Sequence, residues 1–259
     1  MADRFAGNKC IPDSLKCFFE ENKKVALAFS GGTDSAYLLY AAKACGCDIR
    51  AYYVRTAFQP EFETRDAEKM SAEQNVEMTV VEVDILGRPE IAENPANRCY
   101  FCKRALFTEL IKQASADGYD TVIDGTNASD DAGDRPGMRA LYELGVRSPL
   151  RECGVTKIEV REYSRQAGLF TWEKPAYACL ATRVPANTPI TRDILEKVEG
   201  AEDALFRMGF TDFRVRVYMD AARLQMPGSQ MARAIEMRRE IREAVEKYFP
   251  VVMLDLKER

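Results

Sequence analysis

Apolar runs of strand length alternate with helical segments through the first half of the chain, and this alternation restricts the fold more than any other feature. The run "KKVALAFS" (23–30) has too little polar alternation for a half-exposed strand, so it predicts a strand buried on both faces. Further strands are expected at 49–55, 78–84 and 120–126, and helices at 12–22, 61–75 and 99–118. Strand–helix repetition of this kind predicts an α/β fold, a mostly parallel sheet with helices on both faces.

The pattern changes after "RVPANTPIT" (183–191), a segment rich in Pro and Thr that follows a helix predicted at 156–167 from a capping box, Thr156 with Glu159. The expected elements beyond it are a helix, two short strands, a second helix and a last strand, at 191–208, 213–219, 222–226, 228–247 and 251–256. This αββαβ order predicts a small α+β domain. We therefore expect a large domain over 1–187 and a small one over 188–259.

Histidine is absent from all 259 residues, and this absence limits the chemistry. It removes Ser–His–Asp triads, Cys–His dyads and His-based zinc hydrolases, so a metal must be held by Cys or carboxylates. The net charge of −4 provides no general basic field for a nucleic acid. The start "MADRFAGNKC" does not resemble a secretory signal, and no apolar run reaches membrane-spanning length, so we expect a cytoplasmic enzyme.

The first strand leads into "SGGTDS", residues 30–35, at the strand end where α/β proteins bind ligands. Gly31 and Gly32 allow a tight turn that presents bare N–H groups, and the following helix adds its positive end. Ser30 and Ser35 can donate hydroxyls to phosphate oxygens, and Asp34 can hold a magnesium ion. A turn with a Ser/Asp helix cap is the structural alternative. The loop lacks Gly-Lys-Ser/Thr, so it is not a Walker P-loop.

Eight cysteines in such a chain are better interpreted as thiols or metal ligands than as disulfides. Cys99 and Cys102 form a Cys-x-x-Cys pair in "NRCYFCKRALF", and Cys179 stands far away in "KPAYACLATR". The pair could be half of a zinc site, a redox dithiol, two ligands of an iron–sulfur cluster, or part of a core helix. The chain has no second Cys-x-x-Cys pair to close a zinc site, and the surrounding sequence lacks a thioredoxin-like context.

The loop "SGGTDS" resembles the pyrophosphate-binding loop of PP-loop ATP pyrophosphatases, enzymes of the adenine nucleotide alpha hydrolase-like fold. "NRCYFCK", "DGTNASDD", "GDRPGMRALYELGVRSPL", "TWEKPAYACLATRVP" and "FRVRV" resemble, in order and spacing, the LarE family. The resemblance runs over essentially the whole chain. It implies an ATP-dependent sulfur transferase of nickel-pincer nucleotide cofactor biosynthesis, which adenylates carboxylates of a pyridinium-bis-carboxylate mononucleotide and converts them to thiocarboxylates.

The resemblance also assigns the cysteines. In some members the residue matching Cys179 gives up its own sulfur and becomes dehydroalanine. In others it joins the Cys-x-x-Cys pair to bind a 4Fe–4S cluster, and this chain has all three cysteines. The expected cofactors are therefore ATP, Mg²⁺ and a 4Fe–4S cluster on Cys99, Cys102 and Cys179, with Asp34 and Cys179 as catalytic residues. One iron would lack a protein ligand and could hold the sulfide to be transferred.

Other candidate residues follow the fourth strand or lie in the small domain. Asp124 and Asn127 could orient the nucleotide, Asp130 and Asp131 could bind magnesium or belong to a polar loop, and Arg139 and Arg147 could position substrate or form surface ion pairs. The resemblance places three further residues near the substrate phosphate. Arg214 and Arg216 lie in "FRVRV", and Glu202 lies on the helix expected before it.

Arg214 and Arg216 share one face of their strand, which suits a phosphate. Histidines follow this strand in relatives, whereas this chain has "VRVYMD", a departure that leaves the exact substrate open.

Two other functions remain as alternatives. Some tRNA thiolation enzymes also combine a PP-loop with a three-cysteine cluster, although the acidic balance and the lack of an RNA-binding module disfavour this reading. A nucleotide-binding regulatory protein without catalysis is the other alternative. The expected partners are a small-molecule nucleotide substrate, further copies in a homo-oligomer, and a sulfur-donor or cofactor-pathway protein, without a membrane.

Overall fold

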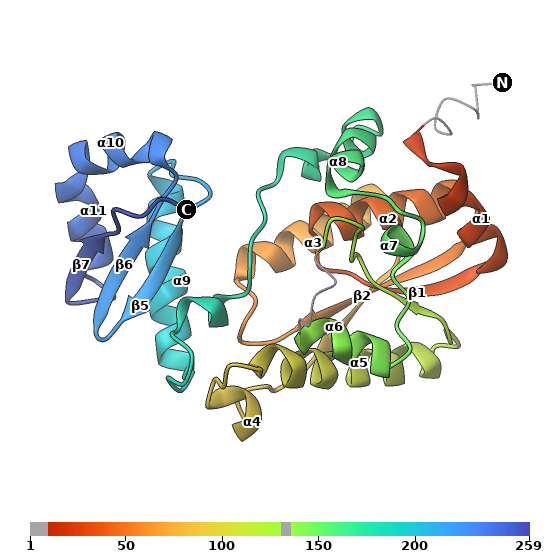
Figure 1. Ribbon diagram of the computed structural model, residues 1–259, viewed down its shortest axis with the longest axis horizontal. Helices are drawn as coiled ribbons and strands as arrows, with labels where there is room; N and C mark the ends of the chain where they lie inside the picture. Colours follow the sequence, from red (N-terminus) through yellow and green to blue (C-terminus); the bar gives the residue numbers. More distant parts are fainter. Residues whose placement is uncertain (1–9, 131–135) are drawn as a thin grey trace. The chain divides into compact units, whose positions relative to one another are not determined.

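The computed structural model describes residues 10–130 and 136–259 (Figure 1). The chain divides into two compact units. The first comprises residues 1–56, 61–83 and 99–174, and the second comprises residues 57–60, 84–98 and 175–259. The sequence-based boundary at 187/188 lies later in the chain than this division at 174/175. The reason is that the segment 176–183 is hydrogen-bonded to arginine side chains of the second unit.

A four-stranded, all-parallel sheet in the order β3-β2-β1-β4 forms the centre of the first unit. Its strands are β1 (Lys24–Ala28), β2 (Asp48–Arg55), β3 (Met78–Glu82) and β4 (Val122–Ile123). β4 is much shorter than the strand expected at 120–126, and on the edge away from β1 it forms a parallel bridge between Ile123 and Arg147. The α/β class predicted from the strand–helix repetition is confirmed.

Helices cover both faces of this sheet (Figure 1). Val25 and Leu27 of β1 belong to one core cluster, whereas Ala26 belongs to the other, so β1 is buried on both faces as its sequence predicts. The helices are α1 (Asp13–Glu21), α2 (Thr33–Ala44), α3 (Glu61–Glu73), α5 (Arg98–Ala116), α6 (Pro136–Glu143), α7 (Pro149–Glu152) and α8 (Lys157–Gln166), with the 3-10 turn η2 (Phe170–Glu173). The capping box predicted for α8 is present, because Thr156 accepts from the Glu159 N–H and Glu159 accepts from the Thr156 N–H.

The second unit contains a three-stranded sheet in the order β5-β6-β7. β5 (Arg214–Tyr218) is antiparallel to β6 (Ala221–Gln225), and β6 is parallel to β7 (Val251–Leu254). Its helices are α4 (Pro89–Ala92), α9 (Arg192–Arg207), α10 (Gly228–Glu236) and α11 (Arg238–Val245), with the 3-10 turn η3 (Leu180–Arg183). The parallel β6–β7 pair requires a crossover, which α10 and α11 supply.

The prediction of a single helix over 228–247 is wrong, because the structure has two helices there that are separated at Met237. The backbone N–H of Met237 caps α10 by donating to Arg233 O, and Met237 O accepts the first hydrogen bond of α11 from Ile241. The break separates two amphipathic helices, and α11 buries Ile241 and Val245 and packs on α9. Among the described helices none combines the length and apolar character needed to cross a membrane.

Candidate functional site

The loop between β1 and α2 has the backbone geometry of an anion-binding turn. Gly31 adopts φ +68°, a left-handed conformation that favours glycine, and a Cβ there would lie 3.1 Å from backbone atoms of Ala67 on α3. Gly32 is the N-cap of α2 and has no side-chain cap. The first N–H groups of a twelve-residue helix therefore remain available at the carboxyl end of the central strand.

The two serine hydroxyls predicted to contact phosphate tie this loop to the helix. Ser30 Oγ and Ser35 Oγ lie 3.1 Å apart. Ser30 Oγ accepts from the Gly32 N–H, and Ser35 Oγ accepts from the Ser30 N–H and donates to Gly32 O. Both hydroxyls thus lie where a phosphate bound by the N–H groups could reach them.

Asp34 points toward two side chains that lie far away in the sequence. Lys157 Nζ is 2.5 Å from Asp34 Oδ2, and the Asn127 side-chain amide donates to Asp34 Oδ1 over 3.4 Å. Burial raises the pKa of the Asp34 carboxyl, and the Lys157 ammonium opposes that shift. Asp34 and Asn127, both named from sequence, are therefore brought together, and Lys157 joins them.

Lys157 and Lys174 are two cations beside this loop that sequence reasoning missed. Lys174 Nζ is 2.7 Å from Asp66 Oδ2 and donates to Gly31 O over 3.4 Å, with only 14% of its side chain exposed. Lys157 is the first residue of the helix with the capping box, and Lys174 lies in "TWEKPAYACLATRVP". Two ammonium groups at an anion-binding turn are suited to offset phosphate charge.

The polar loop after β4 supports this arrangement. Asp124 is buried and accepts from Ser148 Oγ at 2.7 Å and from the Thr126 hydroxyl at 2.6 Å. Its carboxylate therefore holds the loop that carries Asn127. Asp130 accepts from the Asn127 N–H at 2.9 Å, whereas Asp131 lies outside the described residues.

Cys99 and Cys102 occupy the first turns of α5, three positions apart, and so lie on one face of the helix. Cys99 is exposed and Cys102 is half-buried. Cys99 lines a cavity of about 350 Å³ within the first unit. The described lining residues are Cys99, Lys103, Thr126, Asp130, Pro136, Gly137 and Met138. The thiol thus shares a cavity with residues that follow the carboxyl end of β4.

In the second unit, Cys179 belongs to a segment held by guanidinium groups. Arg214 Nη2 donates to Ala176 O at 2.6 Å, Arg183 Nη1 donates to Ala178 O at 2.7 Å, and Arg216 Nη1 donates to Thr182 O at 3.0 Å. Cys179 is the N-cap residue of η3 and is half-buried. The predicted sulfur-bearing residue and the predicted phosphate ligands Arg214 and Arg216 therefore lie in one small region of this unit.

Glu202 is at the centre of that region and is almost fully buried. Its carboxylate forms a two-point ion pair with Arg183, at 2.8 and 3.1 Å, and it accepts from the Val215 N–H and the Tyr177 hydroxyl. The Glu202 carboxylate therefore orients its neighbours rather than offering free oxygens. The guanidinium groups of Arg183 and Arg214 lie 4.5 and 5.0 Å from the Tyr177 ring centroid.

No protein-family model matches the chain. Individual relatives do. An uncharacterized protein of Synechocystis sp. is 37% identical over 226 residues, covering 86% of this chain and 84% of that protein. The pyridinium-3,5-bisthiocarboxylic acid mononucleotide synthase of Lactiplantibacillus plantarum is 29% identical over 94% of this chain and 89% of the synthase. The chain belongs to the LarE family. An uncharacterized protein of Methanocaldococcus jannaschii is 29% identical over 95% of this chain and 94% of that protein.

Two other arginines, which the sequence offered as substrate-positioning residues, form surface ion pairs. Arg139 pairs with Glu143 at 2.7 Å and 69% of its side chain is exposed. Arg147 pairs with Glu152 and stacks over Phe18, 4.9 Å from the ring centroid. The surface ion pairs that the sequence left open for these two arginines are therefore present.

The described residues of this LarE protein include no group of three or more Cys, Asp or Glu side chains close enough to hold a metal ion. Cys99 and Cys102 belong to the first unit and Cys179 to the second. Thiolates are soft ligands that suit iron and sulfide, and Cys99 and Cys102 present two of them on one helix face. The chemistry of this cysteine pair therefore fits two ligands of an iron–sulfur cluster.

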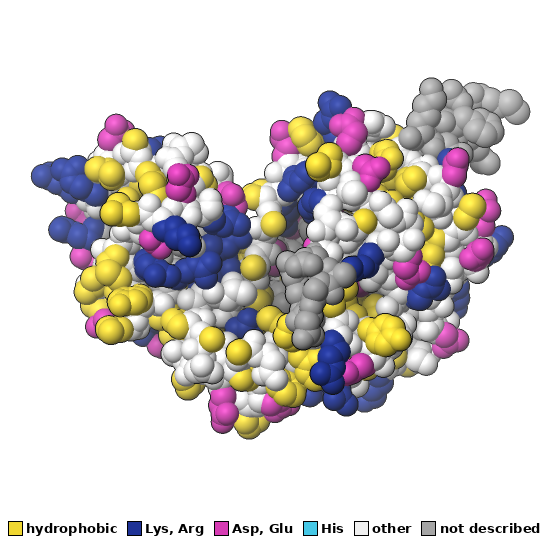
Figure 2. All heavy atoms as spheres, viewed as in Figure 1, with side chains coloured by type: hydrophobic (Ala, Val, Ile, Leu, Met, Phe, Trp, Pro, Cys, Tyr) yellow, Lys and Arg dark blue, Asp and Glu magenta, His cyan; other side chains and the backbone are white. Residues whose placement is uncertain are grey.

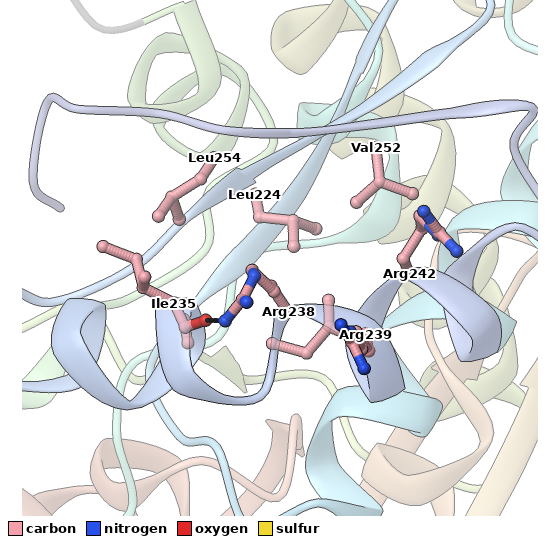
Figure 3. Close-up of a pocket in the computed structure, with 9 residues that line it drawn as sticks. Leu224, Ile235, Arg238, Arg239, Arg242, Val252 and Leu254 are labelled. Atoms are coloured by element: carbon pink, nitrogen blue, oxygen red, sulfur yellow. Dashed lines mark hydrogen bonds between the residues drawn. The ribbon is translucent and has the colours of Figure 1, made fainter.

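A separate cavity of about 440 Å³ lies in the second unit of this LarE protein (Figure 3). Its apolar lining includes Leu224, Ile235 and Val252, and three arginines line it as well: Arg238, Arg239 and Arg242. Arg238 donates to Ile235 O at 3.2 Å. None of the residues predicted to bind ATP, substrate or a cluster lines this cavity.

Proposed function

We propose that this LarE-family chain is an ATP-dependent, AMP-forming sulfur transferase. It would convert a carboxylate of a pyridinium-bis-carboxylate mononucleotide to a thiocarboxylate. The observation that carries the proposal is the uncapped N-terminus of α2, with Gly31 in a left-handed turn and Asp34 beside Lys157. The name of the Lactiplantibacillus synthase supports the substrate class.

The phosphate loop would bind the pyrophosphate portion of ATP. The N–H groups of Gly32 and the first turn of α2 would donate to its oxygens, as would the hydroxyls of Ser30 and Ser35. Asp34, which accepts a hydrogen bond from Lys157, would hold a magnesium ion, and the ion would supply positive charge to the phosphates. Lys157 would then be free to contact a phosphate oxygen.

Adenylation makes the carboxylate reactive. A substrate carboxylate oxygen attacks the α-phosphorus of ATP, and the bond between that phosphorus and the pyrophosphate oxygen breaks. Pyrophosphate is the leaving group and remains bound to the loop, and the substrate now carries AMP as an acyl-adenylate. Sulfide then attacks the acyl carbon, AMP leaves with the former carboxylate oxygen, and a thiocarboxylate remains.

Cys99, Cys102 and Cys179 would hold a 4Fe–4S cluster as its three protein ligands. When bound, the cluster would supply a sulfide for transfer at the iron that lacks a protein ligand. The alternative sulfur source is the Cys179 thiol itself, which would leave dehydroalanine. Cys179 lies in the segment held by Arg183 and Arg214, which fits either role beside an anionic substrate.

Arg214 and Arg216 would bind the nucleotide phosphate of the substrate. Arg214 is only 5% exposed, and its guanidinium group donates to the carbonyl oxygens of Phe213 and Ala176. Burial and the neighbouring Arg183 lower the pKa of Arg214, which is the expected signature of positive charge that an anion would relieve. A homo-oligomer, a sulfur-donor or cofactor-pathway partner and a cytoplasmic location belong to the same proposal.

Anaerobic purification with iron and sulfide analysis tests the cofactor, and turnover with ATP, Mg²⁺ and the mononucleotide tests the reaction. We expect pyrophosphate release and the replacement of one substrate oxygen by sulfur in the product mass. Iron should be lost in C99A, C102A and C179A but retained in C45A as a matched control. Iron retained in all three variants would refute the cluster, and a loss of sulfur from Cys179 after turnover would favour the sacrificial route.

A salt-dependent affinity for tRNA, together with no pyrophosphate release on the mononucleotide, would instead indicate the tRNA thiolation alternative.

A further inference from the structure

Arg259 brings a further guanidinium group to the arginine region of the second unit. Its Nη2 donates to Ala176 O over 3.4 Å, and Ala176 O is also the acceptor of Arg214 Nη2. Two guanidinium groups that share one carbonyl oxygen necessarily lie close together. Arg259 was not singled out from the sequence, because it lies more than forty residues beyond "FRVRV".

The segment that carries Arg259 is fixed to the sheet. The Asp255 N–H donates to Leu224 O at 2.8 Å, and the Arg259 N–H donates to Met226 O at 3.1 Å. Arg259 Nη1 donates to Asp212 O at 2.6 Å and forms an ion pair with the Asp212 carboxylate. The side chain is therefore held near Arg214 by three backbone or carboxylate contacts rather than extending into solvent.

The charges in this region do not balance. Four guanidinium groups donate to carbonyl oxygens of the segment 176–183: those of Arg183, Arg214, Arg216 and Arg259. Glu202 neutralises Arg183, and Asp212 neutralises Arg259. Arg214 and Arg216 form no ion pair with any residue that the structure describes, and their other acceptors are uncharged: Phe213 O, Ala176 O, Thr182 O and Gln225 Oε1.

Glu202 also attracts Arg214 and Arg216, but it is already paired with Arg183. The four guanidinium groups therefore exceed the two paired carboxylates by two positive charges, which match one phosphate monoester of about −1.5 to −2 at neutral pH. Burial together with Arg183 lowers the pKa of Arg259, as burial and Arg183 do for Arg214 and Arg216. Figure 2 shows Lys and Arg side chains gathered on this unit near the point that Figure 1 marks as the C end. One quarter of the Arg259 side chain is exposed, so an anion can reach its guanidinium group from solvent.

We propose that Arg259 binds the phosphate group of the mononucleotide substrate together with Arg214 and Arg216, with Asp212 holding its guanidinium in place. This inference rests on the proposed function, because it takes the phosphate to be that of the substrate. The shared chemistry is a phosphate monoester or free inorganic phosphate. The segment 255–259 is thereby part of the substrate site.

Isothermal titration of the purified full chain tests this role, with nicotinate mononucleotide, its dephosphorylated nucleoside and inorganic phosphate as probes. The variants are R259Q, R214Q and the control R239Q, which removes the same charge from α11, where Arg239 lines the separate cavity. We expect R259Q to weaken mononucleotide binding about 10-fold, in line with one lost charge-assisted hydrogen bond, and to leave nucleoside binding unchanged. R259K should recover part of the affinity, and R239Q should behave like the wild type.

The outcomes separate this inference from the function on which it rests. If R214Q loses affinity and R259Q does not, Arg259 is not a phosphate ligand, but the proposed substrate site stands. If neither variant loses affinity, the proposed phosphate site of the substrate fails as well. If R259Q weakens the nucleoside and the mononucleotide equally, Arg259 has only a structural role and the inference is wrong. If R259Q weakens the binding of inorganic phosphate but not of the mononucleotide, Arg259 binds free phosphate rather than substrate, and the inference is also overturned.

Discussion

The ammonium group of Lys157 lies 2.5 Å from a carboxylate oxygen of Asp34, although 123 positions separate the two residues in the sequence. The first residue of α8 and the first turn of α2 thereby meet at the loop between β1 and α2. Asp34 alone would bring negative charge toward an anion. With Lys157 beside it, the same position can hold a metal ion and contact a phosphate.

K157M tests this pairing. The variant removes the cation and keeps a side chain of similar length, so we expect the Kd for Mg–ATP to rise about 10-fold, as for one lost charge-assisted hydrogen bond of about 1.5–3 kcal/mol. Isothermal titration measures the affinity. K112M is the matched control, because Lys112 is an exposed residue of α5. Equal affinities in both variants would show that Lys157 does not contact the nucleotide.

G31A tests the backbone of the loop. The left-handed φ of +68° costs a residue with a Cβ about 1–2 kcal/mol, and contact of that Cβ with Ala67 adds about 1–3 kcal/mol. Gly145 has φ +69° and nothing within 4 Å of its added Cβ, so G145A experiences the first cost alone. Urea unfolding should show a larger loss of stability in G31A. Identical losses would mean that α3 yields to the new methyl group.

E202Q tests the buried ion pair of the second unit. Removal of the Glu202 charge leaves Arg183 buried and unneutralised, which should lower the free energy of unfolding by about 3–5 kcal/mol. D203N is the control on the same helix, because Asp203 pairs with Arg207 at 3.9 Å in a largely exposed setting worth less than about 1 kcal/mol. Urea unfolding followed by circular dichroism compares them. A loss in E202Q no larger than in D203N would rule out a structural role for the Glu202 charge.

The pH dependence of stability should report the environment of Asp34. Burial raises the pKa of this carboxyl above its ordinary value of 3.8, so the folded chain keeps a proton that the unfolded chain has released. The free energy of unfolding then falls as the pH rises from 3.8 through the folded-state pKa. The D34N variant lacks this titration.

We expect the stability of the wild type relative to D34N to decrease across that pH interval. Urea unfolding of both proteins at a series of pH values measures the difference. A difference that stays constant, or that grows with pH, would mean that the interaction with Lys157 outweighs burial.

The local sequence was sufficient for most elements and for the loop. The uninterrupted apolar run of β1 predicted a strand buried on both faces, and its residues indeed divide between two core clusters. Thr156 and Glu159 predicted the start of α8, because a capping box is satisfied within four residues. The break at Met237 was not predictable from periodicity, since both α10 and α11 continue an amphipathic pattern and only packing of α11 on α9 separates them.

What the sequence by itself determined was the set of residues whose chemistry is local: the glycines of the turn, the serines beside them, and cysteines three positions apart on one helix. Only the tertiary structure decided which distant charges meet. It brought Lys157 to Asp34, placed the Glu202 carboxylate on Arg183, and joined Arg259 to Arg214 through one carbonyl oxygen. The physical reason is that backbone conformation and capping depend on neighbours along the chain. Electrostatic partners instead depend on distance in space, which only the folded sheets and their crossovers set.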